Sequence, residues 1–561
     1  MLAVSARLRL PLTEPVVSTS MAVFALPACY TPAASMRSAN GMQQTAATVE
    51  RIMSNIQQPA ASSGLDREEA VNDSLGTVDR DNEMERGLTN RHVQFIAIGG
   101  AIGTGLFLGS GKSIALDGPS IVLVYILVGG VMFLMMRAIG ELMYRDPSQH
   151  TFINFIRMYL GNGTGKFALW TYWLVLILTG MTELSAVGQY CVTFFHTIGF
   201  ELKSWQWLIE LLFLAALVGV NLIAVKLFGE TEFWFSMIKI FLILALIVTS
   251  IIMVIAGYRY GTTTLPGSNQ TYPAGQASLT NIVDGFSLTP NGWTQMLMSF
   301  QMVFFSYTMI EFVGVTVSET KNPRKVLPKA INGIILRVLV FYVGALLAIM
   351  AIVPWRNFMT NDNGNQFSSP FIMVFEFAGL HWAAAAVFFV VLTAAASSLN
   401  SLLYSAGRHL FQIGEESNSP TLGKLGTVSK TKVPARAIIV SGALILLSPA
   451  LSAMPGVSGA FVLFSSAASA VFIFIYILTM VAHYRYRNSP QFMADGFLMP
   501  AYRVFDPLTI CFFVFIYATL FIGADTRGPA IAALVWLVVF GGYCLLHDRY
   551  SSRGLREALK H

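Results

Sequence analysis

The chain has 561 residues, of which 55% are hydrophobic and only 12% are charged, and its mean hydropathy is +0.61. Soluble domains are nearer one quarter charged, so this composition indicates a polytopic membrane protein. The net charge of +6 comes mostly from Lys and Arg in predicted loops, without a nucleic-acid-binding motif. The scattered cysteines exclude a disulfide framework and a CxxC metal pair, and no HExxH, GxSxG or P-loop pattern indicates an enzyme. We therefore expect no metal, no cofactor and no nucleic-acid partner.

The first residues of the chain differ in composition from the apolar remainder. They are poor in acidic residues at first and become acidic from Asp66 to Glu85. Such a segment is a targeting peptide or, in the simpler interpretation that we prefer, a disordered tail or an upstream-extended reading frame with Met53 as the true start. The predicted division is a disordered or mis-started N-terminal tail over 1–86, a twelve-helix membrane domain over 87–548 and a cytoplasmic C-terminal tail over 549–561.

Glycines interrupt the first apolar stretch of this domain. Between Ile96 and Phe107 stand Gly99, Gly100, Gly103 and Gly105. Each glycine inside a helix costs about 1 kcal/mol relative to alanine, so this cluster predicts a broken helix. A break within a bilayer is tolerated where it lines a protein cavity, because the freed N–H and C=O groups need partners. The N–H groups suit a carboxylate and the carbonyls suit an ammonium group, so the break is a candidate site for a small zwitterion.

Twelve segments are apolar enough to cross a bilayer, which takes about 20 residues. In chain order they are Val93–Leu108, Pro119–Met143, Phe167–Phe195, Trp205–Val225, Glu232–Ile255, Trp293–Val317, Ile331–Pro354, Ala383–Leu410, Ala437–Met454, Gly459–Val481, Asp506–Ile522 and Pro529–Leu546. The short apolar piece Pro370–Leu380 is interpreted as an external interfacial helix rather than as a further crossing.

Basic residues are distributed unequally between the two sides of these spans. One side, which includes both termini, carries Arg91, Arg145, Arg157, Lys166, Lys226, Lys321, Arg324, Lys325, Lys329, Arg408, Lys424, Lys430, Lys432, Arg436, Arg485, Arg487, Arg503, Arg549, Arg553 and Arg556. The other side carries Lys112, Lys203, Arg259, Arg356 and Arg527. Since Lys and Arg are enriched in cytoplasmic loops, both termini are predicted to be cytoplasmic.

The sixth span contains a second candidate break, between Phe304 and Gly314. Ser306 and Thr308 lie in it, although they break helices less strongly than glycine does. The first and sixth spans occupy matching positions in two five-helix halves, as expected for an inverted repeat with a binding site between the halves. The predicted fold is therefore all-α, with a 5+5 inverted repeat followed by two further helices.

Characteristic blocks of sequence follow one another from Leu88 to the last span. They are Asn90–Gln94 with Gly99–Gly105, Met136–Leu142, Gly180–Leu184, Asn221–Glu230 with Glu232–Phe235, and Ser318–Lys325. This series resembles the amino acid permeases of the amino acid–polyamine–organocation superfamily. The resemblance implies a LeuT-like fold of twelve helices, a permease domain over 87–548 and proton-linked uptake of an amino acid.

Within that family, Gly109–Lys112 and Thr393–Ser401 are most similar to the D-alanine/D-serine/glycine branch. The implied substrate is a small neutral amino acid such as glycine, alanine or serine, D-forms included. Relatives usually carry a small residue or glycine near Thr308 and Met309, and this chain does not. An aromatic or larger neutral amino acid is therefore the alternative substrate.

The candidate substrate-binding residues lie at the two breaks. Gly103, Thr104 and Gly105 would offer backbone N–H groups to a carboxylate, and carbonyls near both breaks would accept an ammonium group. The competing interpretation is that these glycines only permit close helix packing. Phe305, Ser306 and Thr308 complete the candidate set, in which the resemblance suggests Phe305 as the aromatic ring over the substrate.

The candidate proton-coupling residues are Lys239 and Glu311, and Glu183 is a further candidate with less support. A lysine inside a span is expensive, at about 3 kcal/mol on insertion scales, so Lys239 either exchanges a proton or snorkels to the cytoplasmic surface. The resemblance favours coupling, because in proton-linked relatives a lysine here takes the place of a sodium ion. Glu311 is either a proton sensor or a structural partner. Arg137 and Glu141 are expected to form an i,i+4 ion pair.

The leading interpretation is therefore a secondary transporter in the plasma membrane whose partners are its amino acid substrate, protons and the lipid bilayer. The alternative from another class is a receptor that binds an amino acid without moving it. Such a receptor needs a signalling module, and none is evident in the predicted tails.

Overall fold

The computed structural model describes residues 102–149, 151–197, 199–223, 225–264, 271–284, 286–317, 322–358, 369–452 and 460–549. Apart from Arg549, the two predicted tails lie outside these residues, as does the first predicted span before Ile102. The described chain is almost entirely helical, and ten of its helical segments are long and apolar enough to cross a membrane. It is therefore a polytopic membrane protein, as its composition predicts.

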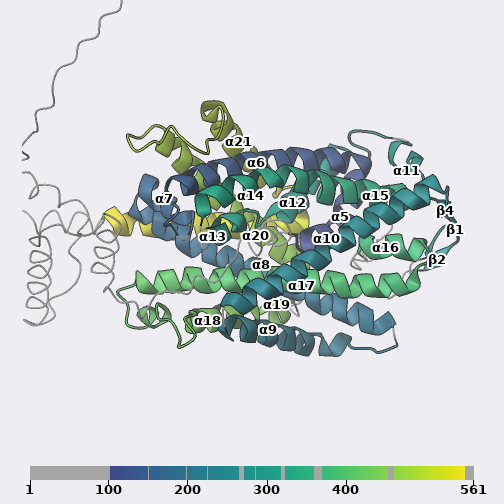
Figure 1. The fold of residues 1–561 in the computed structure, drawn as a ribbon, viewed down its shortest axis with the longest axis horizontal. Helices are drawn as coiled ribbons and strands as arrows, with labels where there is room; N and C mark the ends of the chain where they lie inside the picture. The colour runs from purple at the N-terminus through teal and green to yellow at the C-terminus, as the bar shows by residue number, and fades with distance from the viewer. Residues whose placement is uncertain are drawn as a thin grey trace, which may run out of the picture. The chain divides into compact units, whose positions relative to one another are not determined.

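The first part of the described chain begins with two short helices and ends in a long apolar helix (Figure 1). They are α4 (Thr104–Phe107), α5 (Gly109–Asp117), α6 (Ile121–Arg145), α7 (Ile153–Leu160), α8 (Asn162–Thr197), α9 (Gln206–Ile223) and α10 (Val225–Ile255). Beyond α10 the chain forms two short antiparallel pairs, β1 (Arg259–Tyr260) with β4 (Gly275–Gln276) and β2 (Thr263–Thr264) with β3 (Thr271–Tyr272).

The second part contains the other interrupted helix and the peripheral C-terminal helices. Its elements are α11 (Thr280–Val283), α12 (Trp293–Tyr307), α13 (Phe312–Val317), α14 (Pro323–Arg337), a π-helical turn (Val338–Gly344), α15 (Ala345–Ile352), α16 (Pro370–Phe377), α17 (His381–Glu415), α18 (Ala435–Ile445), α19 (Ser448–Ser452), α20 (Ala460–Arg487), α21 (Tyr502–Thr519) and α22 (Ala524–Trp536).

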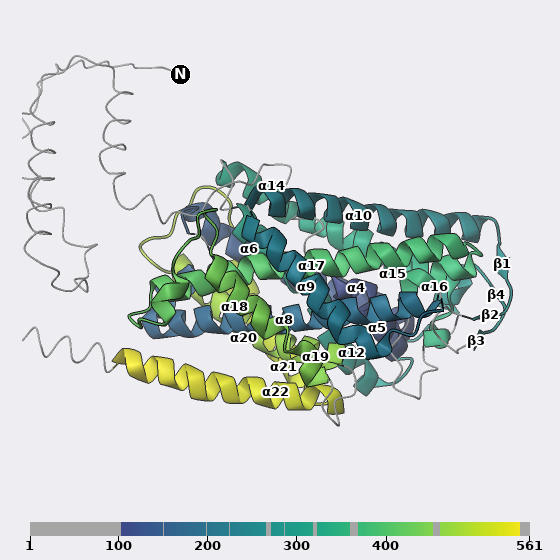
Figure 2. The ribbon, with the colours of Figure 1, turned by 90° about the horizontal axis from the view of Figure 1, so that it is seen from below.

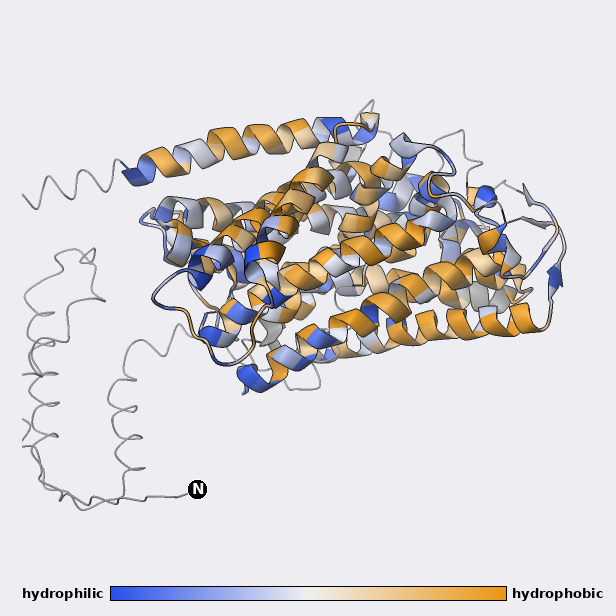
Figure 3. Ribbon diagram, turned by 90° about the horizontal axis from the view of Figure 1, so that it is seen from above, coloured by the Kyte–Doolittle hydropathy of each residue, from blue (hydrophilic) through white to orange (hydrophobic). Residues whose placement is uncertain are grey.

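A buried set of helices is surrounded by helices that face outward. The helix α8 packs against α17 and α20, while α12 packs against α5, α6 and α20. In contrast, α9, α10, α21 and α22 are largely exposed, and α10 and α22 flank the bundle (Figure 2). Their exposed surface is apolar along most of its length (Figure 3), and it includes Phe241, Ile255 and Val535. Such apolar outer faces are what contact with lipid requires.

Three predicted segments differ from the structure. The first apolar segment does not end at Leu108 but continues as α5 to Asp117, where Gly118 turns the chain with a φ of +55°. The predicted span Ala437–Met454 is divided into α18 and α19, so only a short apolar helix replaces it in the described chain. The piece Pro370–Leu380 forms the short helix α16 rather than a crossing, as predicted, but all eight side chains of α16 are buried within the protein.

Candidate functional site

At the predicted first break the described chain enters α4, a single helical turn, from Ile102 and Gly103, which are not helical; the segment before Ile102 lies outside the described residues. Gly103 is extended, with φ −117° and ψ −157°, so the chain enters α4 without a preceding helical residue. The Thr104 N–H of this first turn donates to Glu183 Oε1 of α8 at 3.4 Å. The Thr104 hydroxyl is buried close to the same Glu183 carboxyl group. The break therefore places a hydroxyl and a carboxyl group side by side inside the protein.

The second break separates α12 from α13, as the sequence predicts. Thr308 ends α12 by donating its hydroxyl to the Phe305 carbonyl at 2.7 Å. Met309 follows with a φ of +68°, a left-handed conformation that side chains other than glycine adopt rarely. Turn residues then lead to Phe312, the first residue of α13. The interruption thus needs no glycine, because Met309 itself makes the turn.

The two breaks touch each other through Ser306 and Gly105. The Ser306 hydroxyl donates to the Gly105 carbonyl at 2.8 Å. A Cβ on Gly105 would lie 2.7 Å from Ser306 Cα, which is shorter than any normal contact. Gly105 therefore permits close packing of the two segments, in line with the packing interpretation of this glycine.

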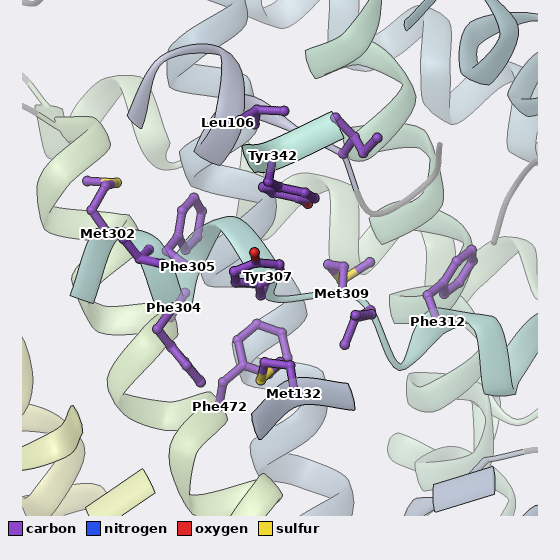
Figure 4. Packing of buried hydrophobic residues seen from close by; sticks show 14 of the residues in the cluster. Leu106, Met132, Met302, Phe304, Phe305, Tyr307, Met309, Phe312, Tyr342 and Phe472 are labelled. Carbon is purple, nitrogen blue, oxygen red and sulfur yellow. The ribbon is translucent and has the colours of Figure 1, made fainter. Parts of the chain in front are cut away.

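Aromatic rings surround the second break (Figure 4). The ring of Phe305 is buried and meets Phe461 of α20 edge-on, with the ring centroids 6.0 Å apart. Tyr307 stacks on Tyr342 at 4.6 Å and donates its hydroxyl to the Tyr125 carbonyl at 3.0 Å. These contacts fix the end of α12 against α6 and the π-helical turn.

Lys239 of α10 is fully buried and points to the first break. Its Nζ atom donates to the Ile102 carbonyl at 3.2 Å and to Ser397 Oγ of α17 at 2.8 Å. The snorkelling interpretation of Lys239 is therefore wrong. An ammonium group in this place lends positive charge to the interrupted segment itself.

Two buried carboxyl groups accompany the break: Glu183, a further candidate in the sequence analysis, and Glu232, which was not a candidate there. Glu232 of α10 accepts the Ser397 hydroxyl at 2.5 Å. Glu183 accepts the Ser398 hydroxyl at 3.1 Å, and a Cβ on Gly103 would lie only 2.6 Å from Glu183 Oε1. The adjacent serines in the Thr393–Ser401 run are a signal for these contacts, since small hydroxyl side chains on a buried helix need polar partners.

Glu311 lies at the second break and is held from two helices. Its carboxylate accepts hydrogen bonds from Tyr172 of α8 at 3.0 Å and from Tyr476 of α20 at 2.7 Å. Glu311 is fully buried. The structure thus gives Glu311 two phenol donors and separates it from the contacts of Lys239.

The predicted pairing of Arg137 with Glu141 is wrong. Arg137 donates to the carbonyl of Leu498 and lies over the ring of Phe497. Glu141 instead pairs with Arg487 at 3.1 Å and accepts a backbone N–H at 2.6 Å. Partners from the end of α20 and from the segment after it take the place of the local ion pair.

Comparison with known proteins identifies the family of the chain. The model of the family described as amino acid permease matches residues 92–550. The chain belongs to the amino acid permease family. This is a family of transporters rather than enzymes, in agreement with the sequence analysis.

Curated relatives of the permease are similar over most of their length. A serine permease of Lactococcus lactis subsp. cremoris is 45% identical over 469 residues, which are 83% of this chain and 98% of the relative. A DL-alanine permease of the same organism is 45% identical over 458 residues, 82% of this chain and 94% of the relative. A D-serine/D-alanine/glycine transporter of Escherichia coli is 36% identical over 465 residues, 82% and 93% of the two chains.

Proposed function

We propose that this permease imports glycine, alanine and serine, D-forms included, together with protons across the plasma membrane. The names of its relatives support this substrate class, because they specify serine, DL-alanine, and D-serine with D-alanine and glycine. The contact between the two helix breaks carries the proposal. Two interrupted helices that meet inside a membrane protein bring backbone N–H and C=O groups to one point.

Each end of a zwitterion has a proposed partner at this point. The N–H groups of Gly103 and Gly105 and the Thr104 hydroxyl bind the carboxylate, and the Thr104 N–H joins them by exchanging its present partner Glu183 for the substrate. Carbonyls around the first break and near Phe305 accept the ammonium group. Ser306 and Thr308 act mainly by holding the breaks in shape, because Gly105 and Phe305 already accept their hydroxyl protons. A site defined by main-chain groups selects the amino acid backbone.

Lys239 is proposed to couple transport to protons. Its buried ammonium group excludes a sodium ion from the same place, because like charges repel strongly away from water. Loss of a proton from Lys239 would make its amine neutral and so weaken its hydrogen bond to the Ile102 carbonyl. The conformation of the first break would then change. Proton exchange at Lys239 is in this way linked to the shape of the substrate site.

Glu311 is the second proposed coupling residue. A carboxylate accepts both hydroxyl protons of Tyr172 and Tyr476, whereas a carboxylic acid carries its own proton and accepts less readily. Protonation of Glu311 would therefore weaken its contacts with α8 or α20. The conformation of the second break would in this way depend on the protonation of Glu311.

The variant Lys239→Met tests the coupling role. Methionine keeps much of the apolar stem and removes the titrating amine, so we expect proton-driven accumulation to fall at least about 10-fold while substrate binding remains measurable. The measurement is uptake of labelled alanine into proteoliposomes against external pH, with a protonophore added in parallel. Lys203→Met removes an exposed lysine and serves as the matched control. An unchanged pH profile in Lys239→Met, or uptake that requires sodium and ignores the protonophore, would contradict proton coupling.

A competition panel tests the substrate class. Glycine, alanine and serine of both hands are expected to compete best with labelled alanine, since they add the least volume beyond the shared backbone groups. Strong competition by phenylalanine with none by glycine or alanine would favour the alternative of a larger substrate. Binding without any uptake would favour the receptor.

The finer fold is part of the same proposal: a LeuT-like 5+5 inverted repeat with two further helices, twelve crossings and both termini cytoplasmic. The breaks before α4 and after α12 support it, because they fall at matching places in the predicted halves. Single cysteines at Arg259 and Arg436 in a cysteine-free background provide the test of sidedness. We expect an impermeant maleimide added outside cells to label the first and not the second. The reverse pattern would invert the proposed orientation.

A further inference from the structure

A buried carboxyl group lies one hydroxyl away from Lys239. Glu232 is fully buried in α10, about two helical turns before Lys239. Lys239 Nζ donates to Ser397 Oγ at 2.8 Å, and Ser397 Oγ donates to Glu232 Oε1 at 2.5 Å. Ammonium, hydroxyl and carboxylate therefore form one continuous hydrogen-bonded chain between α10 and α17.

Polar groups continue along α17 beyond this chain. Asn400 lies one turn after Ser397, and its Oδ1 atom accepts a hydrogen bond of 2.7 Å from Asn221 Nδ2 of α9. Asn221 in turn lines a small pocket with Tyr404 and Arg408. Arg408 belongs to the basic set that the sequence analysis assigns to the cytoplasmic side. The buried carboxyl group thus lies on the side of Lys239 that leads to this pocket, which Asn221 and Arg408 line together with apolar residues.

We propose that Glu232 is the acceptor through which Lys239 releases its proton toward the cytoplasm, with Ser397 as the bridge. The proposal rests on the coupling role of Lys239 given above. In the step, an N–H bond of the ammonium group breaks and its proton binds Ser397 Oγ. The original hydroxyl proton of Ser397 passes to Glu232 Oε1 at the same time. The products are a neutral amine, an unchanged serine and a carboxylic acid, which then loses the proton to water.

The charges around the chain suit such a transfer. Glu232 and Glu183 both attract the charge of Lys239, and Arg337 opposes it. Around Glu232, the charged neighbour is Lys239, and Asn400 and Ser401 add neutral polar groups. A purely electrostatic pair would gain from direct contact, because Coulomb energy falls with distance. The intervening hydroxyl weakens the pair but supplies the path that a proton needs.

The decisive variant is Glu232→Gln, which keeps the size and polarity of the side chain and removes the proton acceptor. If Glu232 receives the proton, Lys239 stays protonated in the variant. Steps of the transport cycle that need no proton release from Lys239 then continue, and steps that need it stop. We expect gradient-driven uptake of labelled L-alanine into proteoliposomes to fall at least about 10-fold. Exchange of external for internal L-alanine should stay within about twofold of the wild type. Acidification of the vesicle interior, followed with a trapped pH dye, should disappear.

Glu210→Gln is the matched control, since Glu210 is also a buried carboxyl group but accepts its hydrogen bond from Gln206 in α9. It should leave uptake, exchange and acidification unchanged. Ser397→Ala removes only the bridge and should reproduce Glu232→Gln, whereas Ser397→Thr should restore uptake. Ser397→Ala takes the place of Glu232→Gln in the comparison if the latter does not fold.

The outcomes separate the relay from the function on which it rests. Normal gradient-driven uptake in Glu232→Gln would overturn the relay and leave proton coupling at Lys239 intact. Equal loss of exchange and uptake in folded protein would also overturn the relay, because it would give Glu232 a structural role. Wild-type uptake that ignores the proton gradient would instead overturn the proposed function itself.

Discussion

Glycines at the first break have different roles that their neighbours determine. Gly105 lies against the backbone of Ser306, so a side chain there has no space in which to turn. Gly103 lies against the carboxyl group of Glu183 and the hydroxyl of Ser398, which are ends of side chains and can yield. The residue type is the same, but the tolerance to substitution is expected to differ.

Gly105→Ala is therefore expected to abolish uptake. Its Cβ would lie 2.7 Å from Ser306 Cα, so the two interrupted segments must separate, and overpacking of this kind costs about 1–3 kcal/mol. The matched control is Gly130→Ala in α6, where a Cβ meets nothing within 4 Å and the helix gains about 1 kcal/mol from alanine. Uptake at equal expression and thermal unfolding of the purified proteins are the measurements. Equal uptake by both variants would show that the two breaks need not touch.

The interrupted helix α12–α13 is the element that depends most on one backbone conformation. Thr308 closes α12, Met309 turns the chain with a positive φ, and Glu311 anchors the turn to two neighbouring helices. None of these features involves glycine. The break is maintained by capping and by tertiary hydrogen bonds rather than by intrinsic flexibility.

At Met309 the isomers leucine and isoleucine are expected to differ. They have the same volume, but isoleucine is branched at Cβ and tolerates a φ of +68° much less well. Met309→Leu should keep most of the uptake, and Met309→Ile should lose at least about 1 kcal/mol of stability with a several-fold loss of uptake. Thermal unfolding and uptake of labelled alanine compare the pair. Identical behaviour of the two variants would mean that the turn relaxes.

At the scale of the whole molecule, a buried charged cluster joins helices that are distant in the sequence. Glu141 of α6 pairs with Arg487 and His483 of α20, and His483 Nδ1 lies 2.7 Å from Asp506 Oδ2 of α21. The segment between α20 and α21 closes the cluster, since Met499 N–H donates to Glu141. The cluster therefore connects the central helix α20 to α6 and to the peripheral α21.

Glu141→Gln is expected to destabilise the fold without touching the substrate site. Loss of one charge from a buried pair leaves the other unsatisfied and costs about 3–5 kcal/mol. Glu201→Gln is the control, because Glu201 pairs with His196 on the surface with 76% of its side chain exposed, where ion pairs contribute about 0–1 kcal/mol. Thermal unfolding in detergent should show a lower transition temperature for Glu141→Gln only. Equal transition temperatures would make the cluster dispensable for stability.

The sequence by itself determined the class of protein and the position of the helix break after α12, and it singled out Lys239 as a candidate. These properties are local. The free energy of transfer of a helix into lipid is a sum over about 20 neighbouring residues, and a glycine cluster or a single charge is recognised within the same 20 residues. The family follows from residues read in order, so it too is independent of spatial contacts.

Only the tertiary structure decided which polar groups meet. Ser306 and Gly105, Ser397 and Glu232, and Arg487 and Glu141 come from segments that are distant in the sequence. A buried polar group must find a partner somewhere, but hydropathy does not state where. For the same reason the local pairing of Arg137 with Glu141 failed and the burial of α16 was missed. An apolar or charged side chain has many chemically equivalent neighbours, and the packing of whole helices selects among them.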